Sequence, residues 1–89
     1  MLVALIARDK AGALDVRKAN REAHLDYAAK SGIVSQAGPL LNDSGDMCGS
    51  LLVLEVEDMA AARSFADSDP YAKAGLFDSV ELIAWKKVI

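Results

Sequence analysis

Apolar and polar residues along this 89-residue chain form patterns that predict four strands and two main helices. Leu2 to Ala7 is an uninterrupted apolar run that ends at a charged cluster, as is typical of a buried strand. From Ala13 to Lys30 apolar residues recur at helical spacing, and no Gly or Pro interrupts them. Gly32 suits the left-handed position that ends such a helix.

The middle of the chain predicts a hairpin. Ile33 to Leu41 is an extended stretch, and the turn formers Asn42 to Asp46 connect it to a third strand from Met47 to Glu57. Because proline has no N–H to give to a ladder, Gly38-Pro39 predicts an irregular, bulged or edge strand in which regular pairing breaks.

The last part of the chain predicts a second helix and a final strand. Asp58 is a good N-cap for a helix from Met59 to Asp67. Pro70 then opens a short helical turn through Ala74, and the last strand runs from Ser79 to Val88. This order predicts one α+β domain over residues 1–89, a ferredoxin-like βαββαβ fold with a four-stranded antiparallel sheet.

The strand composition predicts that the sheet is covered on both faces. Leu52, Leu54 and Val56 would share one face of the third strand, while Leu51 and Val53 would lie on the other. Apolar surface that stays exposed to water forgoes about 25 cal/mol of stabilisation per Å². Since the helices cover only one face, we expect a homodimer that pairs the free faces in a dimeric α/β barrel.

Net charge, apolar runs and cysteine content indicate which partners and which cellular compartment the protein is expected to have. The net charge is -3, which argues against nucleic acid, and no apolar run approaches the ~20 residues needed to span a membrane. The apolar start lacks a basic region, so we do not expect a signal peptide. Cys48 is the single cysteine, which fits a reducing cytoplasm, and one Cys with one His is too few for a structural zinc site.

Six short segments stand out along the chain. They are, in order, Arg21-Glu22-Ala23-His24-Leu25, Gly38-Pro39-Leu40, Gly49-Ser50-Leu51, Asp69-Pro70-Tyr71, Ala74-Gly75-Leu76-Phe77 and Trp85-Lys86. Together they resemble the segments of YciI-like proteins across nearly the whole chain. The resemblance implies a ferredoxin-like dimeric barrel related in fold to muconolactone isomerases and small stress-response monooxygenases. It also implies a site built on a His and an Asp, and a dehydrochlorinase of chlorinated hydroquinones is among the relatives.

His24 and Asp69 are the matching positions, and their chemistry suits acid–base catalysis. Histidine can gain or lose a proton near neutral pH, and a carboxylate can orient its ring and stabilise its charged form. The alternatives are a structural His24 bonded to a backbone carbonyl and an Asp69 that only caps the helical turn at Pro70. One carboxylate has enough acceptor sites for both roles.

Five further residues are candidates for substrate binding, each with a structural alternative. Tyr71 could donate to a substrate oxygen or only pack its ring, and Gly38-Pro39 could line a pocket or only kink the strand. Ser50 could contact the substrate, although a structural role is favoured over that of a nucleophile, and Arg8 could hold an anionic group or be solvated.

Other conspicuous residues are interpreted as structural. Arg17, Lys18 and Arg21 are interpreted as the solvated face of the first helix. Cys48 has no basic neighbour to make it reactive, and Asp43 and Asp46 belong to a solvated turn rather than a calcium site.

Two function classes stay open. The first is a small lyase- or isomerase-like enzyme without a cofactor, acting by proton transfer on a small oxygenated substrate, cyclic substrates included. The sequence contains no nucleotide fingerprint or phosphate loop, which favours chemistry by the protein's own groups. The second is a non-catalytic dimeric module that binds a small ligand or a protein. The first class requires His24 and Asp69 to meet beside a pocket.

Overall fold

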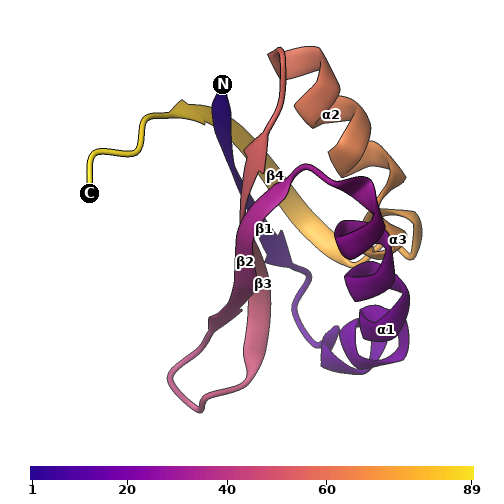
Figure 1. Cartoon of the computed structure of the whole chain (residues 1–89). Coiled ribbons are helices and arrows are strands. Elements are labelled where there is room, and N and C mark those ends of the chain that lie inside the picture. Colours follow the sequence, from indigo (N-terminus) through magenta and orange to yellow (C-terminus); the bar gives the residue numbers. More distant parts are fainter.

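Four antiparallel strands form one sheet in the order β2-β3-β1-β4, and helices cover one of its faces (Figure 1). The computed structural model describes all residues from 1 to 89. The ferredoxin-like order predicted from the sequence is confirmed. The strands are β1 (Leu2–Asp9), β2 (Val34–Leu41), β3 (Met47–Glu55) and β4 (Phe77–Trp85), and the helices are α1 (Leu14–Ser31), α2 (Met59–Ser68) and the short α3 (Pro70–Lys73).

The last strand is displaced from its predicted bounds. β4 begins two residues before Ser79 and ends three residues before Val88. Its bounds follow those of β1, because the pairing runs from Leu2 opposite Trp85 to Asp9 opposite Phe77. A strand at the sheet's edge has no other neighbour to extend it, so the partner strand decides its length.

The predicted break at Gly38-Pro39 is wrong, whereas the predicted edge position is right. Gly38 pairs with Leu51 and Pro39 with Ser50 in continuous register, and the register shifts lie near the two ends of β2 instead. Because β2 is the outermost strand, only alternate N–H groups of its backbone meet β3. A proline fits without interrupting the ladder where its missing N–H would have pointed away from the sheet.

The apolar core lies between the sheet and α2. Asp58 caps α2 as predicted, since its side chain accepts a hydrogen bond of 2.8 Å from the Ala61 N–H. Core side chains from β1 and β3 pack together with those of α2. They are Val3, Leu5, Ala7, Leu52, Leu54, Val56, Ala62, Phe65 and Ala66.

The inner face of α1 is unusually polar. Its buried residues are Arg17, His24 and Ala28, whereas the side chain of Leu25 is 47% exposed. The interpretation of Arg17 as part of a solvated face is therefore wrong. The reason is that partners from distant segments neutralise its charge, as described below.

The second face of the sheet carries no helix (Figure 1). Leu51, Ile83 and Trp85 lie on this face, and each is more than 40% exposed. Arg8 also belongs to this face, because it alternates along β1 with the core residues Leu5 and Ala7. No helix of the structure has the length and apolar character of a membrane span.

Candidate functional site

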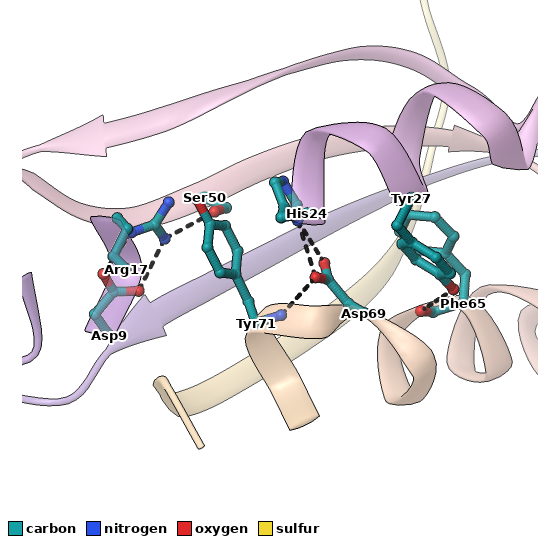
Figure 2. Close-up of polar contacts among 8 residues, drawn as sticks. All are labelled: Asp9, Arg17, His24, Tyr27, Ser50, Phe65, Asp69 and Tyr71. Atoms are coloured by element: carbon teal, nitrogen blue, oxygen red, sulfur yellow. Dashed lines mark hydrogen bonds and ion pairs between the residues drawn. The ribbon is translucent and has the colours of Figure 1, made fainter. Parts of the chain in front are cut away.

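Asp69 occupies the junction between α2 and α3 and has two partners. Its backbone is extended, and its Oδ1 accepts a 2.9 Å hydrogen bond from the N–H of Tyr71, so it caps α3 as an Asp-Pro sequence predicts. Both of its carboxylate oxygens also lie 2.9 Å from Nδ1 of His24 on α1 (Figure 2). The fold therefore brings together two residues that are 45 positions apart.

The other ring nitrogen of His24 is free. Nε2 forms no hydrogen bond within the chain, yet no buried side-chain nitrogen or oxygen lacks a partner. Nε2 is therefore accessible, although His24 as a residue is only 6% exposed. Since an ionised Asp69 can only accept, Nδ1 carries the hydrogen when the imidazole is neutral, and Nε2 then has a free lone pair.

Tyr71 lies between His24 and Arg17 (Figure 2). Its ring stacks on the imidazole with centroids 4.1 Å apart and planes inclined by 16°. The guanidinium carbon of Arg17 lies 4.6 Å from the centroid of the same ring. Because Tyr71 is fully buried and held by both neighbours, it restricts the orientation of the His24 ring.

Arg17 is itself fixed by two polar partners. Its Nε and one terminal nitrogen donate to the two carboxylate oxygens of Asp9 at 2.7 and 2.9 Å, and the same terminal nitrogen donates to Ser50 Oγ at 2.9 Å. Burial lowers the pKa of Arg17, but the hydrogen bond and charge of Asp9 outweigh this effect, and the pKa is raised overall. Arg17 therefore stays charged inside the protein.

The two tyrosines near His24 and Asp69, Tyr71 and Tyr27, stay protonated at neutral pH. Burial raises the pKa of Tyr71, against the opposing charges of Arg17 and Arg21. Burial, and after it the charge of Asp69, raises the pKa of Tyr27, whose hydroxyl donates to the Phe65 carbonyl oxygen at 2.8 Å. Both phenols are therefore hydrogen-bond donors rather than bases.

A cavity of about 120 Å³ opens beside His24. α1, β2, β3 and α3 all contribute to its wall. Polar groups gather on the side of α1, whereas β2 contributes apolar side chains and backbone. The wall comprises Arg17, Arg21, His24, Leu25, Ala37, Gly38, Pro39, Met47, Ser50, Leu52 and Tyr71.

The structure brings most of the predicted binding residues to this cavity. Gly38, Pro39, Ser50 and Tyr71 line it together with His24. Arg8 does not, because its side chain belongs to the face of the sheet that carries no helix. Arg8 therefore lies apart from His24 in the single chain, and its role in substrate binding stays a prediction.

Sequence reasoning missed both arginines of the wall, Arg17 and Arg21, as well as its apolar residues Leu25, Ala37, Met47 and Leu52. The two arginines precede His24 by seven and three positions, which are spacings that share one side of a helix. That periodicity could have placed them beside His24, but basic side chains at such positions normally face solvent. No group of three His, Cys, Asp or Glu side chains in the structure is arranged to hold a metal ion.

The family model for the YCII-related domain matches residues 1–86. The chain belongs to this family. Protein YciI of Escherichia coli is 37% identical over 99% of both chains. A 5-chloro-2-hydroxyhydroquinone dehydrochlorinase from Burkholderia phenoliruptrix, solved in complex with 2,5-dihydroxybenzoquinone, is also 37% identical. Its TM-score is 0.88 over 97% of this chain and 94% of that one.

A more distant structure supports the fold alone. A proposed antibiotic biosynthesis monooxygenase from Bacteroides thetaiotaomicron has a TM-score of 0.62 at 16% identity, over 100% of this chain and 90% of that chain. The ferredoxin-like architecture is therefore also found in a protein with little sequence identity to this chain.

Proposed function

We propose that this protein is a cofactor-independent enzyme that uses His24 and Asp69 for acid–base chemistry on a small oxygenated substrate. The reaction class is elimination, as in a dehydrochlorinase, or isomerisation. The observation that carries the proposal is the contact of both Asp69 oxygens with Nδ1 of His24, which leaves Nε2 accessible beside a cavity. The related dehydrochlorinase, at 37% identity, supports the reaction class.

An elimination needs only groups that this site supplies. His24 Nε2 would take a proton from the substrate, and the electron pair released would form a new π bond. The leaving group, a chloride in a dehydrochlorination, would depart with its own bonding pair. No electron is gained or lost overall, so no redox partner is required. In an isomerisation, His24 would return the proton to a different substrate atom.

The neighbours of His24 have distinct roles in this proposal. Asp69 would hold the ring through Nδ1 and stabilise the imidazolium that forms when Nε2 takes the proton. Tyr71, a protonated phenol, would keep the ring in place by stacking. Ser50 and the backbone of Gly38-Pro39 would contact the substrate from the strand side of the cavity.

We further propose that two copies pair through the face of the sheet without helices. Exposed Leu51, Ile83 and Trp85 on this face would become buried in a homodimer. Light scattering at micromolar concentration should give a mass of about twice 9.4 kDa. A stable monomer would exclude this assembly. The single Cys48, which forms no disulfide within the chain, supports a cytoplasmic location.

Turnover of a substrate panel tests the catalytic proposal. The panel should contain chlorinated and unchlorinated hydroxyhydroquinones and small unsaturated lactones, with chloride release and absorbance as readouts. Positioned acid–base groups contribute about 10²–10⁴-fold, so His24→Ala should lose most of the turnover. Lys18→Ala, an exposed change on the same helix, is the matched control. Urea unfolding of both variants would separate lost chemistry from lost stability.

Two outcomes would contradict the proposal. Turnover that survives in a folded His24→Ala variant would remove His24 from the mechanism. Ligand binding in the cavity without turnover of any panel compound would favour the binding module instead.

A further inference from the structure

The wall of the cavity carries an unbalanced set of charges. Arg17, Arg21 and His24 line it, and no aspartate or glutamate does. Asp69 contacts Nδ1 of His24 and is not part of the wall. Two guanidinium groups at one cavity stand out in a chain whose net charge is -3.

Arg21 is the arginine of the wall that has no acidic partner. Arg17 is matched by Asp9, with which it forms a two-point ion pair. Arg21 forms no ion pair, and its residue is exposed at the opening of the cavity. Its charge opposes the effect of burial on the pKa of Tyr71.

The size and lining of the cavity suit a single ring. Its volume is about 120 Å³, somewhat less than the roughly 150 Å³ of a closed cavity that holds benzene, so a single ring would fill it and its substituent would reach the opening. Leu25, Ala37, Pro39 and Leu52 provide apolar walls for such a ring. The basic groups of the wall come from α1, whereas Ser50 of β3 and Tyr71 of α3 add a hydroxyl and a phenol.

We infer that the cavity binds a single-ring anion, a phenolate or a carboxylate, and that Arg21 recognises its anionic oxygen. This inference deepens the proposed function and rests on it only in taking the cavity beside His24 as the ligand site. Arg21 precedes His24 by about one helical turn and lines the same cavity, so a ring whose anionic oxygen is held by Arg21 would lie beside His24. Arg21 is then a specificity-determining residue.

Binding of benzoate and its neutral counterpart benzamide tests this inference. The full-length protein would be titrated with each probe, and binding followed by calorimetry and by NMR shifts of the residues that line the cavity. Benzoate should bind the wild type more tightly than benzamide. Arg21→Gln should weaken benzoate binding about tenfold, as expected for loss of a charge-assisted contact, and leave benzamide binding unchanged. Lys18→Gln, on the same helix but outside the wall, should change neither.

The outcomes separate this inference from the catalytic proposal. Equal affinity of the wild type for the two probes, or unchanged benzoate binding by Arg21→Gln, would overturn the role of Arg21. Retained selectivity for benzoate in His24→Ala would support an anion site that is independent of the catalytic base. If His24 is needed for turnover of the panel but Arg21→Gln leaves KM for ionised substrates unchanged, the catalytic proposal stands and this inference fails.

Discussion

Removing Arg17 should destabilise the protein far more than removing a surface cation. Arg17 is 2% exposed, and the side chain of its partner Asp9 is 5% exposed. The substitution Arg17→Met keeps most of the side-chain volume but leaves the carboxylate of Asp9 buried and unpaired. Breaking a buried ion pair in this way costs about 3–5 kcal/mol.

The chain offers a matched control for this change. Lys30 and Asp26 also form an ion pair, at 3.0 Å, but their side chains are 77% and 61% exposed. Lys30→Met should therefore cost no more than about 1 kcal/mol. At roughly 0.05–0.15 kcal/mol per residue, the whole chain has a stability of about 4–13 kcal/mol, so Arg17→Met should remove a large fraction of it.

Urea unfolding, followed by circular dichroism, measures both effects. The double variant Asp9→Asn with Arg17→Met removes the unpaired carboxylate charge and should recover part of the lost free energy of unfolding. A cost for Arg17→Met no greater than that for Lys30→Met would show that the ion pair adds nothing in solution. The buried polar face of α1 would then need another explanation.

Three further predictions concern other parts of the molecule. Gly49→Ala should cost about 1–3 kcal/mol in urea unfolding, because a Cβ there would collide with a backbone carbonyl oxygen of β1, whereas Gly38→Ala, where a Cβ meets nothing within 4 Å, should be far milder. Asp69→Asn should lower kcat by less than the roughly 10²–10⁴-fold expected for loss of His24, and an equal loss would assign Asp69 more than an orienting role. The raised pKa of Tyr27 contributes stability that is complete below its ordinary pKa of about 10 and is lost as the pH rises through the folded value. The free energy of unfolding should fall less steeply in Tyr27→Phe than in the wild type between about pH 9 and 11.

The sequence alone determined the elements of the fold and the choice of His24 and Asp69 as a candidate pair. Apolar spacing and turn residues are local signals, so the order of strands and helices and the caps at Asp58 and Asp69 could be predicted from short segments. His24 and Asp69 could be paired in advance because the segments around them resemble those of YciI-like proteins.

Only the tertiary structure decided which polar residues are buried and which partners they contact. Arg17 has the local pattern of a solvated helix residue, and only the approach of Asp9 and Ser50 from two strands makes its burial favourable. The same reason applies to Gly38-Pro39, whose regular pairing depends on β2 being the outermost strand. Spacing along the chain predicts which face a residue occupies, but the partners that meet it there come from distant segments, and only the assembled fold supplies them.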